Sequence, residues 1–452
     1  MHLSGKTVTE PQRTIPVLSE VDVVVVGGGP AGVAAAIAAA RSGARVALVE
    51  RYGYVGGMAT GGHVILLDSM SDDSGRHVIR GIAQEMVDRL DEMGGVVYPP
   101  QSAWGSDDLE LVRKWKRWGA VAGGKHVRYS PVVNPEYFKV LGNRMLDETG
   151  VETIFHAWVC SSLVEENQMR GVVLESKSGR QAVLAGVTVD CTGDGDVFAF
   201  AGADFEHNIF PPGLVFRVGG VDTKRADEFE FENPEKFKEL MTEMTYMGGV
   251  KGGIVEQTVA PGGNYMHTTQ ESIVWFNNSL PQTDVLDVRD LSRVEKEVRE
   301  QMMITLEFFK ERIPGFEKAY LIDTAPQLGT RSSRRIKGEH ELTRKEMLSG
   351  EPVEDVIATV ASGVDGRPLI NIPYRCLLPE RIDNLLVAGR CISTDFVTQT
   401  IIRIIPSCMA TGQAAGTAAA LAVTQKQRPR DIDRSKLQER LASDGQYFGQ
   451  NE

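Results

Sequence analysis

The sequence predicts an α/β fold in which both ends of a 452-residue chain contribute to one parallel sheet. Near the N-terminus a β-branched run, a group of glycines, a small-residue helix and a second strand follow one another. Another strand and another small-residue helix lie near the C-terminus. The long middle is less regular and is expected to form a separate, discontinuous α+β region, since a chain of this length suits two or three domains.

Composition and charge exclude several classes of partner. A formal net charge of −12 argues against binding to nucleic acid or to an anionic membrane surface. No apolar run is long enough to span a bilayer, and the first twenty residues lack the apolar centre of a signal peptide. The five cysteines are scattered and never form a Cys-x-x-Cys pair, which disfavours a disulfide framework, a metal site and a redox pair. We expect a cytoplasmic protein that acts on a small molecule and is able to form a homo-oligomer.

The first motif is the glycine-rich stretch that follows the strand at Val21–Val26. Gly27, Gly29 and Gly32 give the pattern G-x-G-x-x-G. The first glycine permits a tight turn, the second lets the backbone approach a diphosphate, and the third lets the next helix pack against the strand. A lone motif of this kind is weak evidence, so its context decides its meaning.

That context is complete in this chain. A helix of small residues opens at Pro30 and Ala31, and its N-terminus would present unpaired N–H groups to phosphate. A second strand then ends at Glu50, followed by Arg51, where a carboxylate is expected to hold a ribose diol. Strand, glycines, helix, strand and acid in this order predict a Rossmann-like domain that binds a dinucleotide.

A resemblance suggests which dinucleotide it is. "VVVVGGGPAGVAAAIAAARSGARVALVER", followed by "YGYVGGMATGG", resembles the FAD-binding start of flavoproteins in the glutathione reductase superfamily. It is most similar to FAD-dependent oxidoreductases related to the flavoproteins of fumarate reductase and succinate dehydrogenase. The resemblance implies FAD, held noncovalently because the His-Thr pattern for covalent attachment is absent from this loop. It also implies that a short loop lies along the flavin, formed by Gly57, Met58, Ala59 and Thr60.

The same resemblance implies a three-stranded β-meander inserted in the FAD domain, with turns at Glu166-Asn167 and Ser178-Gly179. Backbone near Val159 would contact adenine, and "TGDGD" would pass the diphosphate, although an ordinary turn at a strand end remains an alternative for that stretch. The residues implied near FAD in these later segments are Val159, Thr192, Gly193, Asp194, Gly389, Arg390, Gln413, Ala414 and Ala415.

Three side chains are candidates for the chemistry. Arg331, in a stretch that resembles a family motif G-x-R-x-S-R-R-I, and Arg403, inside an apolar run, could hold a substrate carboxylate or a carbonyl that gains charge. Salt bridges that join the domains are the alternative for both arginines. His63 directly follows the flavin loop and could move a proton, or it could pack or bind FAD.

The expected reaction is hydride transfer between a small organic substrate and flavin N5, by a dehydrogenase or oxidase. A second glycine motif for tightly held NAD(P)H is absent, which disfavours disulfide-reductase chemistry. A flavin monooxygenase that uses NAD(P)H and oxygen, or a non-redox isomerase or lyase, remains an alternative. The expected divisions are an N-terminal arm (1–20), an FAD-binding domain (21–62, 131–204 and 366–424), a substrate-binding region (63–130 and 205–365) and a C-terminal tail (425–452).

Overall fold

The computed structural model describes residues 7–122, 124–249, 265–361 and 369–449. Its largest sheet has five parallel strands in the order β7 (Glu152–Ile154), β2 (Val46–Val49), β1 (Val17–Val26), β10 (Gly179–Asp190) and β19 (Leu385–Val387). Because parallel strands end at the same edge of a sheet, the loops after β1, β2, β10 and β19 meet there, which is where α/β sheets bind ligands. The predicted α/β class with a sheet built from both chain ends is confirmed.

Two antiparallel strands, β8 (Trp158–Glu165) and β9 (Gln168–Ser176), extend this sheet beyond β10. Glu166 and Asn167 both have positive φ, 48° and 64°, as a two-residue hairpin turn requires, so the turn predicted there is confirmed. The third strand of the meander is not separate from the parallel sheet. One continuous strand, β10, pairs with β1 along most of its length, and on its other side with β9 in its first half and with β19 at its end.

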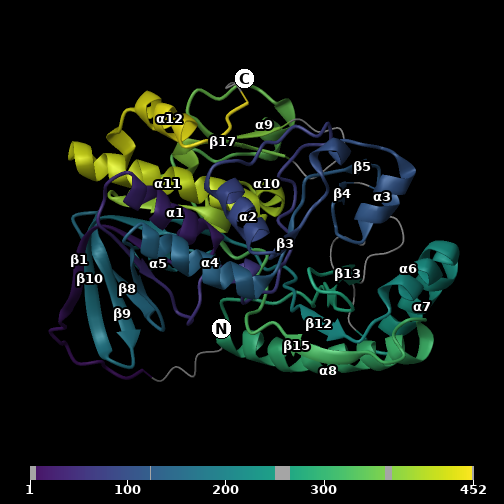
Figure 1. Cartoon of the computed structure of the whole chain (residues 1–452). Helices are drawn as coiled ribbons and strands as arrows, with labels where there is room; N and C mark the ends of the chain where they lie inside the picture. The colour runs from purple at the N-terminus through teal and green to yellow at the C-terminus, as the bar shows by residue number, and fades with distance from the viewer. Residues whose placement is uncertain (1–6, 123, 250–264, 362–368, 450–452) are drawn as a thin grey trace.

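Helices α1 (Pro30–Arg41) and α11 (Ile405–Gln425) pack side by side over the parallel sheet (Figure 1). A Cβ atom on Gly412 would lie 2.1 Å from the Ala31 carbonyl oxygen, and one on Gly416 would lie 2.0 Å from the Ala35 carbonyl oxygen. Their backbones can therefore approach so closely only because glycine stands at both positions.

Three further helices surround this pair. α4 (Pro135–Glu148) is capped at its N-terminus by the Asn134 side chain, which accepts hydrogen bonds from the N–H groups of Glu136 and Tyr137. α2 (Ile82–Glu92) contacts α4 and α11, and α12 (Arg434–Ser443) packs on α11 through buried leucines. The main hydrophobic core therefore includes residues from both ends of the chain.

A second core lies beside the first, at the lower right of Figure 1. Its four-stranded antiparallel sheet has the order β13 (Tyr265–His267), β14 (Val274–Phe276), β12 (Phe216–Gly219) and β15 (Tyr320–Thr324). The long helix α8 (Val288–Arg312) packs against this sheet, with its apolar residues buried and its charged residues on the other face.

The remaining helices and strands are short. The helices are α3 (Leu109–Lys116), α5 (Asp196–Phe200), α6 (Thr223–Glu232), α7 (Pro234–Tyr246), α9 (Arg344–Ser349) and α10 (Phe396–Ile402). The strands are β3 (Val96–Val97), β4 (Val121–Ala122), β5 (His126–Val127), β6 (Val132–Val133), β11 (Phe205–His207), β16 (Arg334–Ile336), β17 (Val356–Val360) and β18 (Ile370–Pro373). Within the described ranges, no helix combines the length and the apolar character needed to cross a membrane.

Candidate dinucleotide and substrate site

A cavity of about 940 Å³ opens where the parallel strands end. This volume lies toward the upper end of the range for sites that enclose a cofactor or a sizeable ligand. One side of the cavity is formed by the loops that follow β1, β2, β10 and β19, and the other includes residues of the second core such as Val215 and Trp275. The cavity thus lies between the two cores of the protein.

The glycine motif forms the first wall, and each glycine has a distinct role. Gly27 has a φ of 97°, and a Cβ atom there would lie 2.5 Å from the Cys191 carbonyl oxygen. A Cβ on Gly32 would lie 1.7 Å from the Gly27 carbonyl oxygen, so Gly32 packs the helix against the turn and does not line the cavity. Gly29 faces open space, with no atom within 4 Å of its missing Cβ. Of these three glycines, Gly29 is the one whose missing side chain leaves room for a ligand.

The start of α1 lies next to this open space. Pro30 and Ala31 line the cavity, and no side chain caps the helix. Pro30 has no N–H group, and the hydrogen bonds of the helix begin with that from the Val33 N–H group to the Gly29 carbonyl. The N–H groups of the first turn therefore stay available to an anion, and the helix dipole favours one there.

Glu50 is held at the end of β2 beside the same loop. Its carboxylate accepts hydrogen bonds from the N–H groups of Gly28, at 2.6 Å, and Tyr52, at 2.9 Å. Burial raises the pKa of Glu50. Glu50 lines the cavity one strand away from the glycines, which is the position predicted for a ribose ligand.

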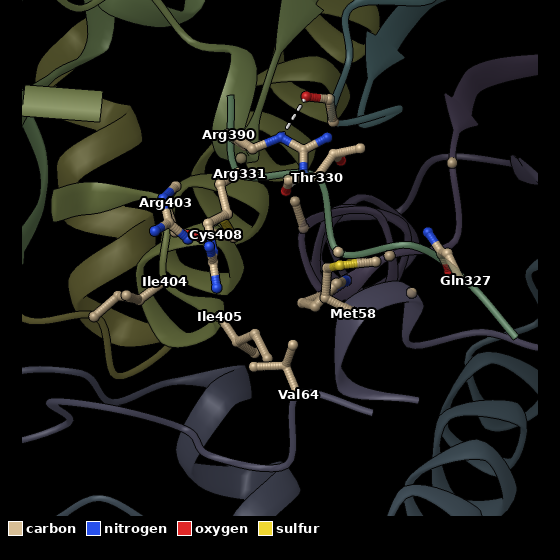
Figure 2. Close-up of a pocket in the computed structure, with 18 of the residues that line it drawn as sticks. Met58, Val64, Gln327, Thr330, Arg331, Arg390, Arg403, Ile404, Ile405 and Cys408 are labelled. Atoms are coloured by element: carbon tan, nitrogen blue, oxygen red, sulfur yellow. Dashed lines mark hydrogen bonds between the residues drawn. The ribbon is translucent and has the colours of Figure 1, made fainter. Parts of the chain in front are cut away.

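A second wall comes from the ends of β10 and β19. Thr192, Gly193, Asp194, Gly389 and Arg390 all line the cavity, as predicted. Arg390 donates to the Gly193 carbonyl at 2.9 Å, to the Asp194 carboxylate at 2.6 Å, and to the Thr330 carbonyl (Figure 2). The Arg390 guanidinium is therefore satisfied within the protein and ties three distant segments together.

Two other arginines in this region, Arg331 and Arg403, have no such carboxylate partner among the residues that the structure describes. Arg331 donates to the Asn278 carbonyl at 2.7 Å and to other neutral oxygens, and burial lowers its pKa to about 10. The Nε atom of Arg403 is buried and finds no hydrogen-bond partner in the described part of the chain. Burial, and then the charges of Arg331 and Arg390, lower the pKa of Arg403 to about 9. Within the part of the chain that the structure describes, no carboxylate pairs with either Arg331 or Arg403, whose side chains lie in one region of the cavity (Figure 2).

The sequence profile of a family described as FAD dependent oxidoreductase matches residues 22–441. This chain belongs to that family. The protein is therefore an FAD-dependent enzyme of the oxidoreductase class, and the predicted cofactor is confirmed.

Other similarities are shorter or weaker. A thiamine thiazole synthase from Desulfosudis oleivorans is 47% identical over 60 residues, which span 13% of this chain and only 23% of that protein. Among solved structures, p-nitrophenol 4-monooxygenase PnpA from Pseudomonas putida has a TM-score of 0.49 at 13% identity, covering 94% of this chain and 84% of its own. The flavin-dependent brominase Bmp2 has a TM-score of 0.47 at 12% identity, and the match covers 94% of this chain and 83% of the brominase chain.

The residues of the cavity fit FAD. The open side of Gly29 and the uncapped turn of α1 would hold the diphosphate, and Glu50 would hold a ribose. Gly57 and Met58 line the cavity beside them, and a Cβ on Gly57 would lie 2.9 Å from the Gly29 Cα atom. The predicted flavin loop therefore passes directly against the diphosphate loop.

Some predicted residues are not brought to the cavity. Ala59 and Thr60 are fully buried, and the Thr60 hydroxyl donates to the Val55 carbonyl, so they shape the flavin loop from behind. Gln413, Ala414 and Ala415 also do not line it, because α11 runs away from the cavity along α1. The Gln413 side chain instead accepts a hydrogen bond from the Ile82 N–H group. The first turn of α11 and the residue before it reach the cavity, through Ile404, Ile405 and Cys408.

His63 lies behind the cavity wall and not in it. It is 3% exposed, with its Nδ1 atom 3.6 Å from an oxygen of Asp323, and its carbonyl accepts a hydrogen bond from the Trp275 indole. Burial is the main cause that lowers the pKa of His63 to about 4. From this position a neutral, enclosed imidazole does not reach a substrate in the cavity, so the structure gives no support for proton transfer by His63.

We expect His63→Asn to reduce the loss of stability on acidification. The imidazole titrates near 6.5 when unfolded and near 4 when folded, so the unfolded state binds more protons between these values. Stability is thus lost as pH falls below 6.5, by up to about 3 kcal/mol by pH 4. Asparagine tolerates the φ of 49° at this position. Urea unfolding across this pH range, with saturating FAD, measures the difference in slope.

The matched control is His156→Asn. His156 is exposed and also has a positive φ, of 55°, so it reports the backbone effect of the same substitution. If the two variants change the pH dependence of unfolding equally, the enclosed His63 imidazole is not the source of the acid sensitivity.

Several residues that line the cavity were not predicted from the sequence. Trp158 adjoins the predicted Val159, and its aromatic character was the available signal. Gln327 also lines the cavity, and its buried amide oxygen has no hydrogen-bond partner among the described residues. Nothing in its local sequence indicates this position, because it depends on a hydrogen bond from the Gln327 N–H group to the Gly61 carbonyl.

Proposed function

We propose that this enzyme is a dehydrogenase or oxidase that acts on a small organic anion at noncovalently bound FAD. FAD, when bound, supplies the centre at N5 that accepts or donates a hydride. The observation that carries the proposal is the pair of arginines, Arg331 and Arg403, in the same cavity as the diphosphate loop and without a carboxylate partner among the described residues.

The energetics of the two guanidiniums favour an anionic ligand. Removing an ion from water costs several kcal/mol unless a counter-charge replaces the lost hydration. Arg390 already has its counter-charge in Asp194, whereas Arg331 donates to neutral oxygens and the charges of Arg331 and Arg390 both act against that of Arg403. A carboxylate can accept two parallel hydrogen bonds from a guanidinium, which orients it as well as neutralising the charge. We assign Arg403 and Arg331 the role of holding and orienting this group.

The wall opposite the dinucleotide loops supports a substrate with an apolar body. It includes Leu66, Val215, Met266 and Trp275. These side chains come from segments 63–130 and 205–365, which we propose as the substrate-binding region. On the motifs of the flavin loop and of Arg331, we also propose that the nearest functional relatives are the fumarate reductase and succinate dehydrogenase flavoproteins.

Anaerobic reduction of the flavin tests the function. Purified enzyme is mixed with a panel of small carboxylic acids and with the matching neutral amides, and loss of flavin absorbance is followed. We expect bleaching by a member of the acid set and not by its amide. Bleaching only by NAD(P)H would contradict the proposal in favour of a monooxygenase, and turnover with a redox-inactive flavin analogue would favour an isomerase or lyase.

A further inference from the structure

The substrate side of the cavity extends well beyond the arginine pair. Arg331 donates to the Asn277 side chain at 3.5 Å, and Asn277 directly follows β14. Trp275 of β14 is the cross-strand partner of Met266 in β13, so their side chains lie on the same face of the sheet. All four residues line the cavity. They form a continuous row that leads away from Arg331 along the second core.

The row continues into the first part of the proposed substrate-binding region. A Cβ atom on Gly119 would lie 2.5 Å from the Met266 Cε atom and 3.0 Å from the Leu66 Cδ2 atom. The Gly119 N–H group donates to the Lys116 carbonyl at 3.0 Å, and Asp68 lies two residues beyond Leu66. These residues also line the cavity. Residues of a strand are about 3.4 Å apart and neighbouring strands about 5 Å, so the row spans on the order of 10 Å or more.

Asp68 brings a carboxylate to this far end of the row. Its Oδ1 atom accepts hydrogen bonds from the hydroxyls of Ser69, at 3.0 Å, and Ser130, at 3.3 Å. These hydroxyls in turn accept hydrogen bonds, Ser69 from the Arg128 guanidinium and Ser130 from the Ser69 N–H group. Among the residues that the structure describes, no donor reaches the Oδ2 atom of Asp68. One carboxylate oxygen is therefore left to accept a hydrogen bond from a ligand in the cavity.

The charges at this end favour a hydroxyl group over an ammonium group as that ligand. Arg128 is already paired with Asp73, so its charge is not reserved for Asp68. Lys116 lines the same end of the cavity, where its positive charge would repel an ammonium group. A hydroxyl group donates one hydrogen bond and accepts others, so it suits both a carboxylate and a lysine.

We propose that the substrate is an elongated hydroxy acid, whose hydroxyl donates to Asp68 while its carboxylate, at the opposite end, binds Arg331 and Arg403. Its apolar body lies along Trp275 and Met266, which gain by covering hydrocarbon. The assignment rests on the proposed function, because it takes the arginine pair as the carboxylate site. Asp68 then selects among organic acids, since an acid without a donor at its far end leaves the Asp68 oxygen unsatisfied.

Two matched series of ligands test the role of Asp68. Straight-chain carboxylic acids of increasing length, and the same acids with a hydroxyl group at the far end, are titrated calorimetrically into the FAD-loaded enzyme and into Asp68→Ala. For an acid that bleaches the flavin, the concentration that gives half-maximal bleaching replaces the dissociation constant. At one chain length the hydroxyl should lower the dissociation constant by about tenfold or more, because it adds a hydrogen bond to a charged group. Asp68→Ala should lose this gain and bind the plain acids within about twofold of the unsubstituted enzyme.

Asp107→Ala is the matched control, since Asp107 is an exposed carboxylate of the same region that does not line the cavity. It should retain the full gain. Asp68→Asn keeps an oxygen for the two serine hydroxyls but makes the second position a donor, so it should also lose most of the gain.

The outcomes separate this assignment from the proposed function. If the plain acids bind but the hydroxyl adds nothing at any length, or if the gain survives in both Asp68 variants, the role of Asp68 is overturned and the proposed function stands. If no acid of either series binds, the arginine site fails, and both the proposed function and the role of Asp68 are overturned.

Discussion

Arg403→Leu is expected to lower kcat/KM for the anionic substrate by about a hundredfold or more, with FAD still bound. The leucine removes a guanidinium that has no carboxylate partner among the described residues and lies in the same cavity as Arg331. Because an unpaired buried cation destabilises the folded state, the free energy of unfolding should stay constant or rise. Steady-state kinetics with the acid and with its neutral amide, together with thermal unfolding, measure both effects.

The control for this substitution is Arg403→Lys, which keeps the positive charge but cannot donate two parallel hydrogen bonds. Its kcat/KM should lie between that of the unsubstituted enzyme and that of Arg403→Leu. A structural salt bridge would give the opposite pattern. Breaking a buried ion pair destabilises a protein by about 3–5 kcal/mol and leaves a distant reaction unaffected. That pattern, a less stable variant with unchanged turnover, would remove Arg403 from the substrate site.

Gly29→Ala should weaken FAD binding by about tenfold to a hundredfold without harming the fold. At Gly29 φ is −67°, which alanine adopts readily, and no atom lies within 4 Å of the added Cβ. The methyl group would instead occupy the space beside the helix N-terminus where the diphosphate is expected. Because alanine restricts the unfolded chain, the free energy of unfolding without FAD should rise by up to about 1 kcal/mol. Flavin titration and urea unfolding measure the two quantities.

Gly32→Ala, three residues along the chain, is expected to affect stability in the opposite direction from Gly29→Ala. Its Cβ would lie 1.7 Å from the Gly27 carbonyl oxygen, so the backbone must move and the protein should be destabilised or insoluble. If Gly29→Ala and Gly32→Ala lose stability alike, then Gly29 also serves packing and its open side is not a ligand site.

Sequence patterns predicted the parts of this protein whose signals are local. The glycine spacing and the position of Glu50 after its strand each depend on a few adjacent residues, and the structure has both as predicted. The family match confirms FAD. Cytoplasmic localisation and a homo-oligomeric state stay predictions from the sequence.

The sequence could not show which part of a long helix faces the cavity. The small residues of α11 were interpreted as facing the flavin, but Gly412 and Gly416 pack on α1, and only the first turn reaches the cavity. Small residues allow close approach to a helix as readily as to a ring system. The enclosure of His63 by Trp275 and Asp323 could not be predicted for a similar reason, because both residues are distant from it in the sequence.

The pairing of β19 with β10 has a consequence for how the enzyme is made. Thr188 and Leu385 are partners in this ladder although 197 residues separate them, and Arg390 and Arg403 come later still. A ribosome would release the glycine motif long before it releases the far wall of the cavity. Stable capture of the flavin therefore has to wait until the segment that carries β19, Arg390 and Arg403 has left the ribosome.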